Sequence, residues 1–170
     1  PMQYQIMAML FPCKMTILGD KAQTMDEKQQ DVLQFLPGIL GKKLRKIAMN
    51  KSYRNTVEIA TYAADLTGIT DLELFERHGK PVVEETLFSQ QEAVEKIAAD
   101  LRVRPDGYET AAVLTMTDQE AWEITKTMKE RLGEDSVTYM NKDSSHFQKG
   151  ITVATFYLAK GLEFDQVFTI

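Results

Sequence analysis

Apolar residues along the chain fall into two patterns, which are short runs rich in β-branched residues and longer segments with helical spacing. The short runs predict strands at 14–18, 44–49, 82–88, 111–115, 137–140, 151–155 and 167–170. The longer segments predict helices at 3–10, 28–36, 55–67, 89–104 and 118–132, with a short helix at 158–162. The segment 71–75 is too short for the pattern to decide its type. This alternation is typical of an α/β protein with a mainly parallel sheet.

Cap residues sharpen the helix ends. Ser89 precedes a helical segment, and Glu92 stands three residues later, where it completes a capping box. Either Thr117 or Asp118 caps the next helix. The pair Pro37-Gly38 is expected to end the helix at 28–36, because proline and glycine interrupt helices.

Composition narrows the class of protein. The chain has 170 residues, a hydrophobic fraction of 44% and a formal net charge of −5. An acidic chain is unlike proteins that coat nucleic acid through a broad basic face, although local phosphate contacts stay open. No apolar run is long enough to cross a bilayer, and the N-terminus lacks a secretory pattern. We therefore expect a soluble, cytoplasmic protein with no membrane contact.

Cysteine and histidine give no sign of a metal centre. Cys13 is the single cysteine, so it cannot form an internal disulfide, and no Cys/His cluster has zinc spacing. We expect Cys13 to be buried and inert. His78 and His146 lie in polar stretches and are expected on surface loops.

Three polar segments follow predicted strands or begin predicted helices, where open α/β sheets bind ligands. The first is Gly19-Asp20-Lys21-Ala22-Gln23, directly after the predicted strand 14–18. Gly19 lets the chain leave the strand sharply, so that Asp20 or Gln23 can bond a phosphate-bound water or relay a change to a neighbouring domain. A plain β-turn with polar tips is the alternative.

The second segment is Asn50-Lys51-Ser52-Tyr53-Arg54-Asn55-Thr56, at the start of a predicted helix. An arginine near a helix N-terminus opposes the helix dipole, so Arg54 does not serve to stabilise the helix. Its guanidinium and the exposed N–H groups together suit an anion, and Tyr53 beside it suits a base. A helix cap with a solvated arginine and a packed tyrosine is the alternative.

The third segment runs from Tyr157 to Asp165 and is the most specific. The pair Lys160-Gly161 follows a strand and a small-residue turn, which suits backbone approach to a phosphate. Glu163 is placed to hold a ribose hydroxyl or a water of a magnesium ion. The alternative is a charged loop between two buried strands.

Two absences limit what the chain does alone. It has no Gly-x-x-x-x-Gly-Lys-Thr loop, which is the main phosphate cradle of ATPases. It also has no Asp-Glu pair after an apolar strand ahead of Gly19. We therefore expect no ATP hydrolysis by this chain on its own, and its start at Pro1 and its end in an apolar run indicate a piece of a larger protein.

The three segments, in this order, resemble motifs III, IV and V of superfamily 1 DNA helicases of the UvrD/Rep type. In that family the patterns are Gly-Asp-x-x-Gln, Tyr-Arg-Ser-Thr, and a strand leading to Ala-Lys-Gly-Leu-Glu-Phe-Asp. Asn55 replaces the usual serine here, and the matches span most of the chain. The resemblance implies a RecA-like three-layer fold of the P-loop NTPase class. It also implies that 1–37 is the tail end of the first motor domain and 38–170 the second motor domain, truncated at its C-terminus, with the boundary near the Pro37 to Lys43 interruption.

The resemblance also implies roles for individual residues. Gln23 resembles the glutamine that senses the γ-phosphate of ATP, and Arg54 resembles the arginine finger that contacts it from the second motor domain. Tyr53 resembles the tyrosine that stacks on adenine. The other expected nucleotide contacts are Asp20, Gly161 and Glu163. ATP and Mg²⁺ are expected as cofactors of the intact helicase, with none in the isolated fragment.

Two departures from the family pattern affect which macromolecule is expected as the partner of this chain. Tyr157 stands where the family has the histidine that couples to single-stranded DNA, so Tyr157 and Lys160 are the candidate nucleic-acid contacts. The form Tyr-Leu-Ala-Lys-Gly resembles the helicase IV/HelD branch, some of whose members act on bacterial RNA polymerase. The expected partners are therefore the first motor domain of the same chain and DNA, single-stranded or duplex. RNA polymerase is the alternative partner, and a small α/β interaction domain with coincidental motifs is the third interpretation.

Overall fold

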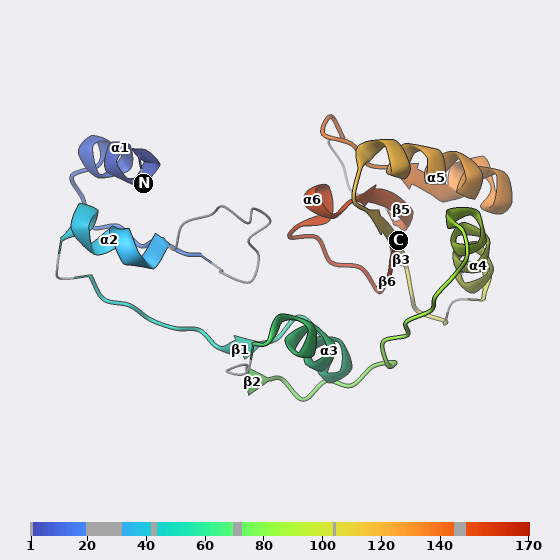
Figure 1. Ribbon diagram of the computed structural model, residues 1–170, viewed down its shortest axis with the longest axis horizontal. Helices are drawn as coiled ribbons and strands as arrows, with labels where there is room; N and C mark the ends of the chain where they lie inside the picture. Colours follow the sequence, from blue (N-terminus) through green and yellow to red (C-terminus); the bar gives the residue numbers. More distant parts are fainter. Residues whose placement is uncertain (1, 20–31, 42–43, 70–72, 104, 145–148) are drawn as a thin grey trace. The chain divides into compact units, whose positions relative to one another are not determined.

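The computed structural model describes residues 2–19, 32–41, 44–69, 73–103, 105–144 and 149–170 (Figure 1). The chain divides into two compact units, which are an N-terminal unit, Pro1–Val83, and a C-terminal unit, Glu84–Ile170. Each unit is described by itself below.

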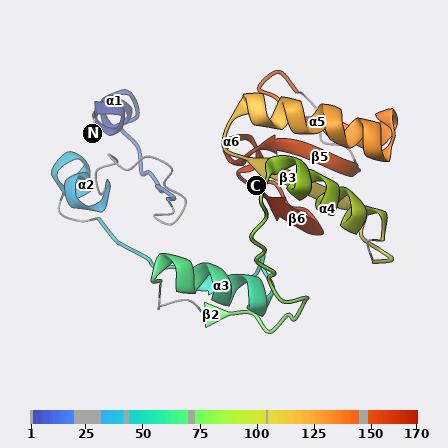
Figure 2. The same cartoon turned by 45° about the vertical axis from the view of Figure 1, so that its right-hand side comes forward.

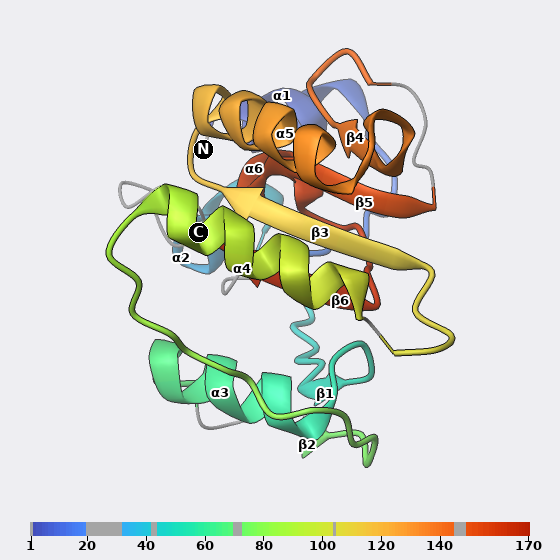
Figure 3. The same ribbon diagram turned by 90° about the vertical axis from the view of Figure 1, so that its right-hand side faces the viewer.

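The C-terminal unit is built on a four-stranded sheet with the strand order β4-β5-β3-β6. Every neighbouring pair is parallel, and Val113 of β3 lies opposite Val153 of β5 on one side and Phe168 of β6 on the other (Figure 3). The strands are β3 (Thr110–Thr115), β4 (Val137–Tyr139), β5 (Gly150–Thr155) and β6 (Gln166–Thr169). The central strands β3 and β5 are buried on both faces, which explains their near-continuous apolar sequences.

Two helices cover one face of this sheet, α4 (Gln90–Arg102) and α5 (Asp118–Leu132). They lie in front of the strands in Figure 3. Both helices bury residues at positions i, i+3, i+4 and i+7, the spacing that places side chains on one helical stripe. The buried sets are Val94, Ile97, Ala98 and Leu101 on α4 and Ala121, Ile124, Thr125 and Met128 on α5. With Ala111, Val113, Ile151 and Val153 of the strands, most of these residues form the main core.

The opposite face has a thinner cover. Ala112, Leu114 and Ala154 point to it and pack with Ala159 of α6 (Phe156–Ala159). Side chains from Met140, Phe156 and Phe164 complete this second cluster. The chain therefore places helices on both faces of a parallel sheet, as the sequence pattern predicts.

The cap residues explain where the helices begin. Thr117, rather than Asp118, caps α5, and it forms a full capping box with Glu120. Ser89 caps α4 by accepting from the Glu92 N–H. The Glu92 carboxylate, however, accepts from the backbone N–H of Phe88 at 3.0 Å, one residue earlier than the expected box.

The N-terminal unit contains three helices and two very short strands among its described residues. α1 lies beside α2, with the rings of Tyr4 and Phe35 5.8 Å apart (Figure 2). The elements are α1 (Met2–Leu10), α2 (Val32–Leu40), β1 (Lys51–Ser52), α3 (Val57–Thr67) and β2 (Glu73–Leu74). Among the described residues of this unit, only Leu36 and Ala60 are buried hydrophobics.

Several predictions from the sequence are wrong in this unit and just after it. The runs 14–18, 44–49 and 82–88 form no strand in the structure. A strand needs a neighbour for its backbone groups, and none of these three runs is paired with another strand. Helix α2 also continues through Pro37 to Leu40 instead of ending there. Cys13 is exposed rather than buried, because the segment around it packs into no core.

The remaining elements match the pattern closely. α6 begins two residues earlier than the predicted short helix, at Phe156. The predicted α/β fold with a parallel sheet is confirmed for the C-terminal unit. None of the helices in the described residues has the length and apolar character needed to cross a membrane.

Candidate functional site

The strand connections single out one place in the C-terminal unit. The chain leaves β3 through α5, on the face of the main core, and leaves β5 through α6, on the opposite face. β3 connects towards β4 and β5 connects towards β6, in opposite directions across the sheet. In open α/β sheets, ligands bind outside the carboxyl ends of the strands at such a switch point.

Two exposed side chains follow the strands at this point. Met116 comes directly after β3 and is 75% exposed, and Tyr157 comes after β5 and is 74% exposed. Beneath them, the Thr115 and Thr155 side chains are buried. The Thr115 hydroxyl donates to the Thr117 carbonyl at 2.9 Å, and the Thr155 hydroxyl accepts from the Leu158 N–H at 3.3 Å. These bonds fix where the two strand ends turn.

The third strand end, that of β4, carries a phenol bound to a carboxylate. Tyr139 donates to Asp118 at 2.6 Å, which ties the end of β4 to the start of α5. This bond, then partial burial and the charge of Asp118, raise the pKa of Tyr139 to about 12. The Trp122 ring lies 5.3 Å from that of Tyr139. The contacts of Tyr139 therefore have a structural role.

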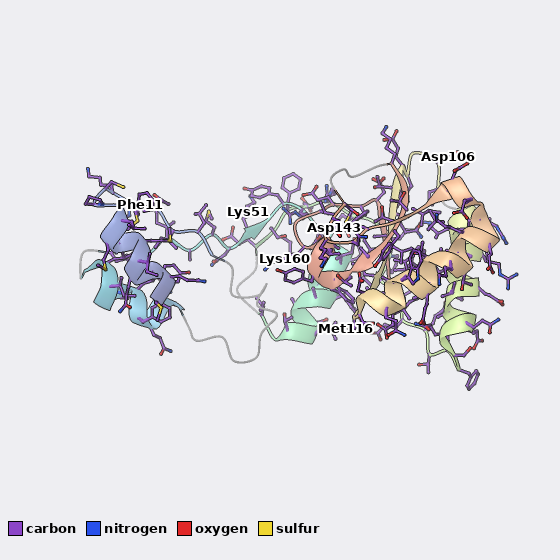
Figure 4. The ribbon with its side chains drawn as sticks, turned by 90° about the horizontal axis from the view of Figure 1, so that it is seen from above. Phe11, Lys51, Asp106, Met116, Asp143 and Lys160 are labelled. Carbon is purple, nitrogen blue, oxygen red and sulfur yellow. The ribbon has the colours of Figure 1, made fainter. Side chains whose placement is uncertain are left out.

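Met116, Asp143 and Lys160, which follow β3, β4 and α6, are labelled in Figure 4.

The segment that carries the third sequence motif crosses the sheet. Tyr157 lies on α6, after the carboxyl end of β5, and Lys160 follows that helix. The Leu162 N–H donates to the Ala159 carbonyl, and Gly161 has φ +89°, a backbone conformation that favours glycine. Lys160, Gly161 and Glu163 are all exposed. The sequence motif thus places a basic and an acidic side chain on one connection that begins at the switch point.

Asp165 ends this segment beside the amino end of β3, opposite to the strand ends described above. Its carboxylate accepts from the Thr110 hydroxyl and from the backbone N–H groups of Thr110 and Glu109, at 2.8 to 2.9 Å. Its own N–H donates to the Thr110 hydroxyl at 3.0 Å. These bonds attach the motif to the amino end of β3. The aspartate that closes the motif therefore has a structural task here.

In the N-terminal unit, Tyr53 and Arg54 form the turn between β1 and α3. Thr56 caps α3 by accepting from the Ile59 N–H, so Arg54 lies just ahead of the helix N-terminus, as expected. Tyr53 and Arg54 are both exposed. The Tyr53 ring lies 5.7 Å from that of Phe75, and the Lys51 ammonium is 5.4 Å from the Tyr53 ring centre.

A carboxylate on the first turn of α3 binds the segment that follows β2. Glu58 accepts from the Gly79 N–H at 2.9 Å and contacts Nδ1 of His78, also at 2.9 Å. The His78 contact above all, with help from the N–H groups of Glu58 and Gly79, lowers the pKa of Glu58 to about 2. His78 is exposed, as expected for a loop histidine. Sequence reasoning missed this pair, because no periodic pattern links a helix residue to a loop residue 20 positions later.

The predicted residues therefore fall into two groups and a remainder. Tyr53 and Arg54 lie together in one unit, and Tyr157, Lys160, Gly161 and Glu163 lie on one connection in the other. Asp20 and Gln23 lie outside the described residues. The domain boundary near residue 37 stays a prediction.

A cavity of about 320 Å³ lies beside the start of β5 in the C-terminal unit, and no residue of the two groups lines it. Its cations are already engaged, since Arg102 donates to the Arg131 carbonyl and Lys149 pairs with Glu109. Its lining residues are Leu101, Arg102, Leu132, Asp135, Ser136, Lys149, Gly150 and Ile151. In the described part of the chain, no three or more His, Cys, Asp or Glu side chains gather as metal ligands would.

No family model matches the chain, and no curated protein matches it either. The case for a function therefore rests on the residues, their order and their geometry.

Proposed function

We propose that this chain is the ATP-sensing part of a helicase-like motor, a second RecA-like motor domain of the UvrD/Rep type. The last elements of the first motor domain precede it. The observation that supports this proposal most strongly is that the third motif follows β5 of an all-parallel sheet, at the topological switch point. The Lys160-Gly161 pair lies on the connection that begins at this point, outside the carboxyl end of a strand, where α/β sheets bind ligands.

In this proposal, Tyr53 and Arg54 bind the ATP. Arg54 is exposed just ahead of α3, and a guanidinium presents its donors in a planar fork that suits the γ-phosphate of ATP. Tyr53, beside Arg54, offers an exposed ring on which the adenine can stack. Such stacking is open to every base, because each base has a π face. In this proposal ATP lies between two motor domains, and Gln23 and Arg54 report its γ-phosphate.

In this proposal, the segment from Tyr157 to Glu163 contacts the nucleic acid and the nucleotide. Tyr157 and Lys160 are exposed, so a nucleic-acid strand can reach them. Gly161 and Glu163 contact the nucleotide on the same connection. Mg²⁺ accompanies the ATP, but no cluster of possible metal ligands exists among the described residues, so we assign the ion no ligand in this chain.

The test is ATP hydrolysis by the intact protein that carries this chain, with and without single-stranded DNA. Arg54→Ala is expected to lower turnover by about 10³-fold or more, because an arginine finger contributes that much in related phosphoryl transfers. Arg45→Ala removes another exposed arginine from the same unit and is the matched control, expected to leave turnover unchanged. Wild-type turnover in Arg54→Ala would exclude this role for Arg54.

A second candidate function follows from Tyr157. Its side chain is 74% exposed at the position where the family's histidine couples to single-stranded DNA. The candidate is a motor module of an RNA-polymerase-binding factor that uses ATP to release or recycle the polymerase. Co-purification of the intact protein with RNA polymerase, together with no strand displacement on forked DNA, would favour it. Strand displacement without polymerase binding would favour the helicase.

A further inference from the structure

The segment Glu73–Gly79, here called the brace, contacts the chain on both sides of Arg54. Before Arg54, the two strands pair in parallel, with Lys51 opposite Glu73 and Ser52 opposite Leu74. The Ser52 carbonyl accepts from the Phe75 N–H at 3.0 Å. The ring contact between Tyr53 and Phe75 extends this pairing to the residue next to Arg54.

After Arg54, the brace holds the first turn of α3. The Val57 N–H donates to the Arg77 carbonyl at 2.9 Å. The Glu58 carboxylate binds His78 and the Gly79 N–H, each at 2.9 Å. A helix start normally leaves its N–H groups without partners in the helix, so the brace satisfies one of them at Val57.

Gly79 marks the closest approach between the brace and the helix cap. A Cβ added to Gly79 would lie 2.8 Å from Cγ2 and 3.3 Å from Oγ1 of Thr56. Thr56 cannot move away without cost, because its hydroxyl caps α3 by accepting from the Ile59 N–H. Position 79 therefore requires glycine, although its φ is not in the left-handed range.

We propose that the brace positions Arg54, and that His78, Glu58 and Gly79 are positioning residues for the arginine's contact with the γ-phosphate. This inference rests on the proposed function. Arg54 lies between two anchored ends, and each end is held by a different part of one segment. An arginine finger acts through placement, and a displacement of about 1 Å can cost about 10²-fold in rate.

The test measures ATP turnover by the intact protein for His78→Ala, Glu58→Gln and Gly79→Ala. We expect kcat to fall about tenfold to hundredfold while KM for ATP changes less than about twofold, because the variants misplace a transition-state contact. His78→Asn is the conservative variant. The asparagine Nδ2 lies as many bonds from Cα as the histidine Nδ1, so this variant is expected to restore most of kcat.

Two matched controls accompany these variants. Gly38→Ala, on α2, adds a methyl group that meets no atom within 4 Å. Glu130→Gln neutralises an exposed glutamate on α5. Both are expected to keep wild-type kcat. Melting temperatures separate a loss of folding from a loss of placement, and Glu58→Gln, which keeps the side-chain volume, provides the comparison if His78→Ala melts early.

A double-variant cycle shows whether the brace acts through Arg54. In an Arg54→Ala background, Glu58→Gln and Gly79→Ala are expected to cause no further loss, because the residue they position is gone. A full additional loss, or wild-type kcat in all three single variants, would overturn the brace while leaving the motor intact. Unchanged turnover in Arg54→Ala itself is a different result, which removes the proposed function and the brace with it.

Discussion

At the scale of single residues, the contact between Glu58 and His78 defines a pH dependence. The pKa of Glu58 is lowered from 4.5 to about 2, so the folded chain favours the ionised carboxylate. A lowered carboxyl pKa contributes stability that is present above about pH 4.5 and is lost as the pH falls towards 2.

The prediction is that Glu58→Gln lowers the melting temperature at about pH 5, and that this difference shrinks as the pH falls from 4.5 to 2. Thermal melts of the two chains across this range measure it. Glu130→Gln, which changes an exposed glutamate on α5, should give parallel curves. A difference that grows towards low pH would contradict the assignment.

At the residue scale, part of the candidate site could be predicted from the sequence alone. The position of Arg54 ahead of α3 was predictable, because Thr56 is a strong cap and the helix that follows is clearly amphipathic. The contacts of His78, Gly79 and Phe75 were not. They depend on how a loop folds back, and loop closure leaves no periodic trace in the sequence.

At the scale of elements, the helices and strands of the C-terminal unit were predictable, whereas the strand predicted at 82–88, mostly in that unit, and several elements predicted in the N-terminal unit were wrong. β3 and β5 have long apolar runs, and α4 and α5 repeat their apolar residues with helical spacing. The runs 14–18, 44–49 and 82–88 also contain β-branched residues, but each carries at least one charged residue and forms no strand in the structure. Strand propensity reports fit to a half-buried pleated surface, so a run without a partner strand stays irregular.

The cap of α5 gives a prediction at this scale. Thr117→Ala removes the bonds that join the Thr117 side chain to the N–H and carboxylate of Glu120, and should destabilise the chain by about 1 kcal/mol. Thr127→Ala, in the same helix, is the matched control. Its hydroxyl contacts only the Glu123 carbonyl at 3.4 Å, and alanine is the better helix former there. Urea unfolding of both variants measures the difference, and equal stability would contradict the capping role.

At the scale of the whole molecule, the two units differ in how much they bury. The main core belongs to the C-terminal unit, where Val113, Val153 and Met128 are fully buried. Burying a side chain of this size contributes about 1.5–3 kcal/mol each. The described residues of the N-terminal unit bury only Leu36 and Ala60 among their hydrophobics.

We therefore predict that amide hydrogen exchange is slowest in β3 and β5 and fastest in α1 and α2, because exchange follows local burial and contact density. Mass-spectrometric exchange on the chain at neutral pH measures this order. Met128→Ala should speed exchange in β3 and β5, since it opens a cavity beneath them, and should leave α1 and α2 unchanged. Equal protection in both units would contradict the prediction.

The parallel arrangement around β3 also has a consequence for synthesis of the chain. Both neighbours of β3 come later in the sequence, since it pairs with β5 and then with β6, whose last residue is Thr169. Until residues 150–169 have been made, β3 has no partner strand for its backbone edges. Bare edges invite pairing with other chains. A nascent chain that stalls before Asp165 lacks β6 and also the carboxylate that binds Thr110, so such incomplete translation products are prone to aggregation.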